Sequence, residues 1–167
     1  MEKIASFKVN HDILKKGMYI SRVDRDIVTY DVRMKEPNKG DYLENAPMHT
    51  FEHLFATYVR NTKYAESIIY VGPMGCRTGF YFIVRDEISH SEAIDIMKNT
   101  FDFVIAFEGE IPGTNKIECG NYLEHDLDGA KNIAKDMKNV LQNWNEERMN
   151  YDEWQNSCYY WRNGLRS

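Results

Sequence analysis

Residues 45–61, NAPMHTFEHLFATYVRN, carry the strongest periodic signal in the chain. Apolar side chains recur there at spacings of three and four residues: Met48, Phe51, Leu54, Phe55, Tyr58 and Val59. This spacing puts them on one face of an α-helix. Asn45 is a candidate N-cap and Pro47 suits the first turn, so we predict a helix over residues 45–61.

A strand pattern precedes this helix. Positions 28, 30, 32 and 34 are apolar, and the positions from 29 to 35 between them are polar. Alternation with a period of two indicates a strand with one buried and one exposed face. Residues 18–23 can pair with it through the polar turn Asp24-Arg25-Asp26, so we predict an antiparallel hairpin.

Two further strands and two further helices are predicted downstream. Residues 67–71 and 80–84 are apolar, β-branched or aromatic, and the glycine-rich loop GPMGCRTG, residues 72–79, separates them. A second helix starts at the Ser89 to Ser91 caps and runs through Val104. A third covers residues 127–149, and residues 108–125 between these helices are irregular.

Length and composition favour one domain, spanning residues 1–167. The 167 residues are 43% hydrophobic, enough for a single core. The net charge is −5 and no long basic run occurs, which argues against nucleic acid and anionic membranes as partners. We find no signal peptide or membrane-spanning stretch, and the three cysteines are too few and odd in number for a disulfide framework. We therefore expect a soluble, cytoplasmic protein whose aromatic tail, residues 151–167, packs against the rest.

The sequence HTFEH inside the predicted helix is a candidate metal motif. His49 and His53 are four residues apart, which on a helix means about 40° of rotation and about 6 Å of rise. Both imidazoles can therefore reach one ion, and Glu52 can hold a water or a substrate proton beside it. His-x-x-Glu-His is the inverted zinc motif. The alternative is two ordinary histidines that happen to have this spacing.

Cys119, in the irregular segment, is a candidate third ligand. A thiolate added to two imidazoles gives a three-ligand site with an open fourth position, as a catalytic metal requires. Two nitrogens and one sulfur suit Zn²⁺, Fe²⁺ or Co²⁺. The alternative is a small buried apolar side chain, which is a common environment for a free cysteine.

Cys76 lies between Gly75 and Arg77 in the glycine-rich loop. A neighbouring guanidinium or a metal would lower the pKa of this thiol and favour a thiolate that acts as base or nucleophile. The alternative is a structural cysteine in a tight turn. His90 and Cys158 have no such companions, and we assign them to structure or solvent.

Three motifs taken together resemble one enzyme family. HTFEHL (49–54), PMGCRTGFY (73–81) and CGN (119–121) leading into HDLDGA (125–130) resemble the S-ribosylhomocysteine lyase (LuxS) family, the autoinducer-2 synthases of quorum sensing. Ser6-Phe7 with His11, and Asp31-Val32-Arg33 followed by Pro37-Asn38-Lys39, look like the N-terminal substrate-binding elements of that family. The resemblance covers residues 6–130.

This resemblance implies an α+β fold of two layers, with an antiparallel sheet covered by helices. It implies one divalent metal per chain, iron in the cell with zinc or cobalt as substitutes, held by His49, His53 and Cys119. Glu52 and Cys76 would move protons, and Ser6, His11 and Arg33 would contact the substrate. Family members cleave S-ribosylhomocysteine to homocysteine and 4,5-dihydroxy-2,3-pentanedione as homodimers with active sites at the subunit interface.

The chain departs from the family at two places. Tyr70-Val71-Gly72 stands where a more polar stretch is expected, and the aromatic tail extends past the usual end. The first departure bears on how the homocysteine end is held. Two alternatives to the lyase use the same motif: a small metallopeptidase, in which Glu52 activates water, and a non-catalytic metal-binding module.

Overall fold

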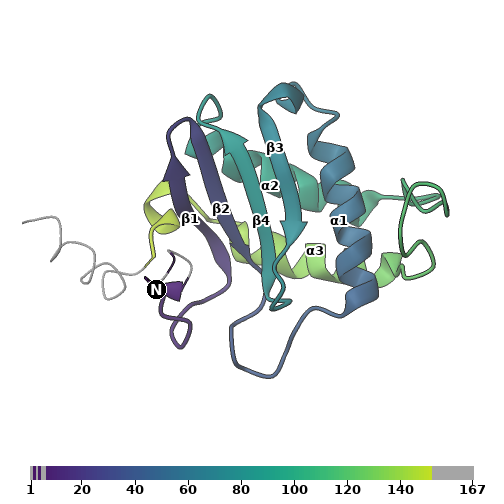
Figure 1. The fold of residues 1–167 in the computed structure, drawn as a ribbon, viewed down its shortest axis with the longest axis horizontal. Coiled ribbons are helices and arrows are strands. Elements are labelled where there is room, and N and C mark those ends of the chain that lie inside the picture. Colours follow the sequence, from purple (N-terminus) through teal and green to yellow (C-terminus); the bar gives the residue numbers. More distant parts are fainter. Residues whose placement is uncertain (1, 3, 5–6, 152–167) are drawn as a thin grey trace, which may run out of the picture.

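The structure is a computed structural model that describes residues 2, 4 and 7–151. A four-stranded antiparallel sheet has the order β1-β2-β4-β3, with β1 at Gly17–Asp24, β2 at Ile27–Arg33, β3 at Ile68–Pro73 and β4 at Gly79–Arg85. Helices α1 (Asn45–Val59), α2 (His90–Ala106) and α3 (Leu127–Leu141) lie on one side of it (Figure 1). The predicted two-layer α+β fold is confirmed.

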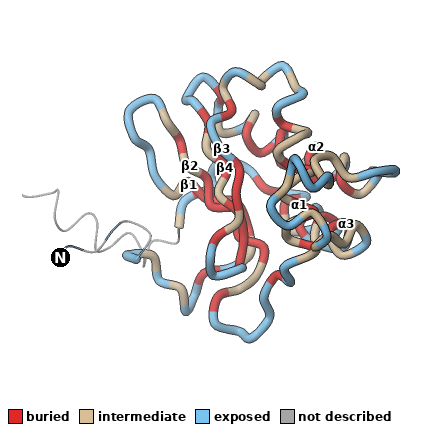
Figure 2. Tube along the Cα trace, turned by 45° about the vertical axis from the view of Figure 1, so that its right-hand side comes forward, coloured by how far each residue is buried: buried red, intermediate tan, exposed pale blue. Residues whose placement is uncertain are grey.

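The core forms where the apolar face of the sheet meets the helices (Figure 2). Tyr30 and Val32 of β2 pair in register with Phe82 and Phe80 of β4, and all four are fully buried. Phe51 of α1 packs on Phe80 with ring centroids 5.2 Å apart. The three-and-four spacing that predicted α1 therefore marks the face that this helix buries.

The helix ends differ in part from the sequence predictions. The N-cap of α1 is Glu44, with no side-chain cap, and Asn45 is already helical. At α2 the prediction holds, because Ser89 forms a capping box with Glu92. α3 ends at Leu141 rather than at residue 149, because Trp144 turns back over β1 and donates its indole N–H to the carbonyl of Met18 at 3.0 Å.

The strand prediction was wrong about the burial of the second face of β2. Alternation indicated exposed polar residues there, but Asp31 is 2% and Arg33 3% exposed. Tyr151 reaches this face from the far end of the chain and donates a hydrogen bond to Asp31. Both faces of the strand are therefore covered at this point, and a buried ion pair replaces the expected solvent contact.

The aromatic tail is described only at its first residue. Tyr151 stacks on Tyr19 of β1 with ring centroids 5.0 Å apart and an interplanar angle of 18°. The remaining tail, residues 152–167, lies outside the described residues, as does Cys158. Within the described part of the chain, no helix is both long enough and apolar enough to cross a membrane.

Candidate metal centre and cavity

Helix α1 places His49 and His53 side by side, with ring centroids 4.7 Å apart. The Nδ1–H of His49 donates to the carbonyl of Glu124 at 2.9 Å, and that of His53 to the carbonyl of Pro112 at 2.7 Å. A carbonyl only accepts, so each Nδ1 carries the hydrogen and each Nε2 keeps its lone pair. Backbone acceptors of this kind orient histidines that bind a metal.

Cys119 joins these histidines from the irregular segment. Its Sγ lies 3.4 Å from Nε2 of His49, and its backbone N–H donates to the carbonyl of Asn115 at 3.0 Å. One possible ligand atom from each of His49, His53, Cys119 and His125 lies within 4.8 Å of the others. We call these four residues the histidine–cysteine group. The sequence prediction named three of them.

His125 is the member that sequence reasoning missed. Its ring stacks on that of His49, with centroids 4.1 Å apart, and its Nε2 is buried without a hydrogen-bond partner among the described residues. Burial, and the neighbouring charges of His49 and His53, lower the pKa of His125 and favour its neutral ring. The only sequence signal was its place in HDLDGA, six positions after Cys119.

Thr50 decides which nitrogen of His125 carries the hydrogen. The Thr50 hydroxyl accepts the N–H of Asp126 at 2.8 Å and lies 3.1 Å from Nδ1 of His125. Within the described residues, that Nδ1 is the one acceptor for the hydroxyl hydrogen. This pattern leaves a hydrogen on Nε2, so His125 fits a donor role beside a metal better than a fourth ligand role.

The donor set fits a divalent transition metal. Two imidazole nitrogens with free lone pairs and one thiol are the ligands that zinc, iron and cobalt accept. With His125 as a hydrogen-bond donor, His49, His53 and Cys119 are the three residues that could hold such an ion. Glu52, half-buried and next to His53 on α1, makes no side-chain hydrogen bond or ion pair with any described residue. Its carboxylate is therefore available for proton transfer.

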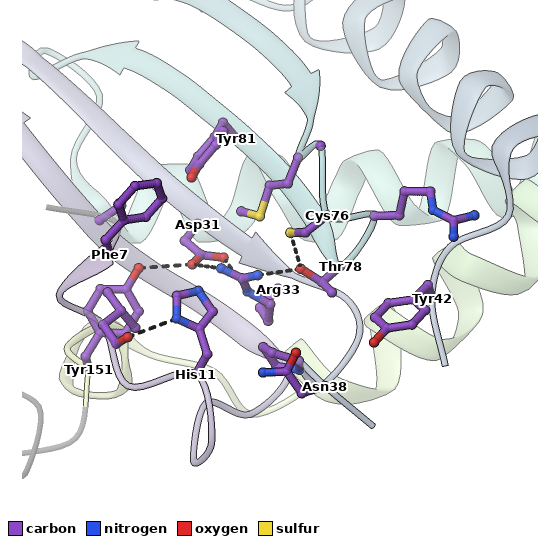
Figure 3. Close-up of a pocket in the computed structure, with 16 residues that line it drawn as sticks. Phe7, His11, Asp31, Arg33, Asn38, Tyr42, Cys76, Thr78, Tyr81 and Tyr151 are labelled. Carbon is purple, nitrogen blue, oxygen red and sulfur yellow. Dashed lines mark hydrogen bonds and ion pairs between the residues drawn. The ribbon is translucent and has the colours of Figure 1, made fainter. Parts of the chain in front are cut away.

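A cavity of about 610 Å³ lies on the other face of the sheet (Figure 3). Its size suits a small molecule. It is lined by the N-terminal segment, β1, β2, the segment after β2, the β3–β4 loop, β4 and Tyr151. The lining residues include His11, Asp31, Arg33, Cys76, Thr78 and Tyr81.

Arg33 and Asp31 form a buried ion pair in this cavity. Nε and Nη2 of Arg33 donate to the two carboxylate oxygens of Asp31, at 3.1 and 2.6 Å. Nη1 donates to Oγ1 of Thr78 at 2.5 Å, and that oxygen lies 3.0 Å from Sγ of Cys76. Burial opposes the Arg33 charge, but the Asp31 carboxylate outweighs it and raises the pKa of Arg33.

Backbone contacts hold Cys76 in place. The N–H of Arg77 donates to the carbonyl of Met74, and the carbonyl of Thr78 accepts the N–H groups of Met34 and Lys35. The left-handed position of this loop falls on Arg77, with φ 57°, and not on a glycine. Gly79 is needed for space, because a Cβ there would lie 2.2 Å from the carbonyl oxygen of Val32.

The predicted site residues therefore fall into two sets. His49, His53 and Cys119 come together, and His11, Arg33 and Cys76 line the cavity. No described member of the histidine–cysteine group lines that cavity, and Glu52 does not line it either. Ser6 lies outside the described residues.

The stretch Tyr70-Val71-Gly72 has a particular packing arrangement. Tyr70 is 50% exposed on β3, and its hydroxyl fills the space where a Cβ on Gly72 would stand. The side chain of Tyr70 can therefore take this position only because Gly72 has no side chain.

Comparison with known proteins gives a consistent result. Residues 4–148 match the family described as S-ribosylhomocysteinase (LuxS). A protein of Clostridium acetobutylicum is 44% identical over 158 residues, covering 92% of this chain and 100% of its own length. One from Porphyromonas gingivalis W83 is 45% identical with the same coverage, and one from Phocaeicola vulgatus is 42% identical, covering 90% and 98%. All three relatives are named S-ribosylhomocysteine lyase.

Proposed function

Because the chain belongs to the S-ribosylhomocysteinase (LuxS) family of lyases, we propose that it cleaves S-ribosylhomocysteine in a metal-dependent reaction. The products are homocysteine and 4,5-dihydroxy-2,3-pentanedione, the autoinducer-2 precursor. The observation that carries the metal dependence is the convergence of His49, His53 and Cys119 next to an unpaired Glu52. Free thiols at both parts of the site suit the reducing cytoplasm.

His49, His53 and Cys119 hold the metal in this proposal, with iron as the cellular ion and zinc or cobalt as substitutes. When bound, the ion supplies Lewis-acid stabilisation of negative charge on the sugar oxygens. With its hydrogen on Nε2, His125 would offer a buried hydrogen-bond donor to a ligand beside the ion. The hydrogen bonds from Nδ1 of His49 and His53 to backbone carbonyls would hold both rings so that their Nε2 atoms can bind the ion.

The chemistry requires proton transfer at several carbons of one sugar. The substrate carbonyl begins at the anomeric carbon, so it must move along the chain before the thioether can leave. Each move takes a proton from one carbon and returns it to the neighbouring one. When the carbonyl lies two carbons from the sulfur-bearing carbon, loss of the proton between them breaks the C–S bond. The sulfur leaves with the electron pair and is protonated to the homocysteine thiol.

Two bases divide this work. We assign the earlier transfers to Cys76 and the later ones, including the elimination, to Glu52. Cys76 lies on the cavity side, with Thr78 linking it to the Arg33 guanidinium. The cavity holds the sugar through His11 and Arg33, and we keep Ser6 as a substrate contact although it lies outside the described residues.

The two-set arrangement supports a homodimer with composite active sites. Glu52 and the metal ligands belong to one set, and Cys76 belongs to the cavity, yet the reaction needs all of them at one sugar. Two chains related by a two-fold axis can bring the first set of each against the cavity of the other. We therefore propose that each active site forms between subunits.

A thiol-release assay with metal analysis tests this function. Purified protein incubated with S-ribosylhomocysteine should release free thiol, and it should hydrolyse no control peptide. Stripping the metal with a chelator should abolish the release, and the divalent ion should restore it. His49→Ala, His53→Ala and Cys119→Ala should each lower the metal content, whereas His11→Ala, in the cavity, should keep it.

Two outcomes would contradict the proposal separately. Absence of thiol release from metal-loaded wild-type protein would reject the reaction. Full metal content in all three ligand variants would reject the ligand assignment while leaving the reaction open to another metal arrangement.

A further inference from the structure

Tyr151 reaches the cavity from beyond residue 148, where the match to the family model ends. The matched region ends at residue 148, and Tyr151 lines the cavity together with His11, Arg33 and Cys76. The chain gets there because α3 ends early and the residues after it cross β1, where Tyr151 stacks on Tyr19. A side chain from the C-terminal end of the described residues therefore forms part of the wall that faces the proposed substrate.

The Tyr151 hydroxyl is fixed by polar contacts. It donates to Oδ2 of Asp31 at 3.0 Å (Figure 3), and Ser21 of β1 lines the same cavity. Burial, with the nearby Asp31 charge, raises the pKa of Tyr151. The phenol therefore stays protonated at physiological pH and remains a donor to Asp31.

Asp31 in turn determines where the Arg33 guanidinium points. A guanidinium has five N–H groups. Three are used by the two Asp31 oxygens and by Thr78, which leaves two for a ligand. Because the Asp31 charge compensates that of Arg33, the pair is close to neutral. Such a pair suits hydroxyl or carbonyl oxygens of a sugar better than a carboxylate, which needs an uncompensated cation.

We propose that Tyr151 is a positioning residue for sugar recognition, which it serves by locking the Asp31–Arg33 pair through its hydrogen bond to Asp31. The proposal rests on the lyase function proposed above. The same chain of contacts continues from Arg33 through Thr78 to Cys76. A loosened Asp31 is therefore expected to affect both sugar binding and the reactivity of the thiol.

Tyr151→Phe tests this with a matched control. The substitution keeps the ring on Tyr19 and removes only the hydroxyl. Tyr64→Phe also removes a hydroxyl that donates to a carboxylate, that of Glu92 at 2.9 Å, but outside the cavity. We expect Tyr151→Phe to raise KM about fivefold, with kcat within about twofold of wild type, and Tyr64→Phe to change neither.

A second measurement does not depend on turnover. Iodoacetamide labelling of Cys76 is measured without substrate, on the peptide that contains this cysteine, and should slow about twofold in Tyr151→Phe. Without the Tyr151 hydroxyl, the negative charge of Asp31 offsets more of the positive charge of Arg33, which then favours the Cys76 thiolate less. Wild-type KM in an active Tyr151→Phe protein would overturn the proposal, even if its melting temperature fell. If wild-type protein released no homocysteine, the lyase function would fail instead. In that case, an unchanged labelling rate of Cys76 in Tyr151→Phe would overturn the Tyr151 proposal on its own.

Discussion

The histidine–cysteine group and the cavity are built in opposite ways. Two members of the group come from one helix, where a four-residue spacing alone places them together. The cavity draws on residues from across the chain, from Phe7 to Tyr151, and lies against the sheet face away from the helices. The group presents imidazole and thiol ligand atoms suited to a cation, whereas the cavity contains a compensated ion pair suited to an uncharged polar ligand. Local spacing thus builds the metal site, and long-range packing builds the site for the sugar.

Replacing the two proposed bases should give the largest effects. Cys76→Ser removes a group that can ionise near neutrality, and Glu52→Gln keeps the shape of the side chain but not the base. Each should lower turnover by at least about 10²-fold, as expected for a lost acid or base. Thiol release gives the rate, and metal analysis should show an ion content close to wild type in both variants.

Cys76→Ser separates the lyase from every other use of the metal motif. A metallopeptidase or a metal-binding module has no role for a thiol in the cavity. Alkylation of the wild-type protein should also abolish activity, and bound S-ribosylhomocysteine should protect Cys76. A Cys76→Ser protein that released thiol at the wild-type rate would refute the two-base mechanism, even with the metal site correct.

Mixing the two inactive variants should recover part of the activity if each site forms between subunits. After random exchange, half of the dimers contain one chain of each variant. In these dimers one site carries both substitutions and the other carries neither. The mixture should therefore regain about a quarter of wild-type activity. Native mass spectrometry verifies the exchange. Verified exchange without any recovered activity would place Glu52 and Cys76 on the same chain at each site.

The difference between the two regions also explains what the sequence could predict. Helix α1 (Asn45–Val59) and its histidine pair follow from a period of 3.6 residues, which needs no tertiary information. The burial of Asp31 and Arg33 could not be predicted, because alternation on β2 does not reveal that Tyr151, 120 positions later, covers that face.

Other misses have the same origin. The end of α3 depends on Trp144 reaching the carbonyl of Met18, and the donor role of His125, in the segment before α3, depends on Thr50 of α1. The left-handed conformation fell on Arg77 although glycines stand nearby, because the contacts of its loop set the backbone path. Each of these features depends on residues that are far apart in the sequence.

Two buried threonines allow the smallest and sharpest comparison of the regions. Thr50 is 0% exposed, and its hydroxyl contacts His125 of the histidine–cysteine group. Thr78 is 2% exposed, and its hydroxyl contacts Arg33 of the cavity. Thr50→Val removes the contacts to His125 and to the N–H of Asp126, which anchor the end of the segment that carries Cys119. Loss of metal to a chelator should become about tenfold faster, as for other outer contacts of a metal site. Labelling of Cys76 should stay unchanged.

Thr78→Val should show the reverse pattern. Nη1 of Arg33 donates to the Thr78 oxygen, and in the proposed mechanism the Thr78 hydroxyl then donates its hydrogen to Sγ of Cys76 when the thiol acts as a base. Without it, iodoacetamide labelling of Cys76 should slow about threefold, the loss expected for one modest hydrogen bond. Metal loss to the chelator should match wild type. If either valine variant changed both measurements to the same extent, the metal centre and the cavity would be coupled within one chain, and their treatment as separately built regions would be wrong.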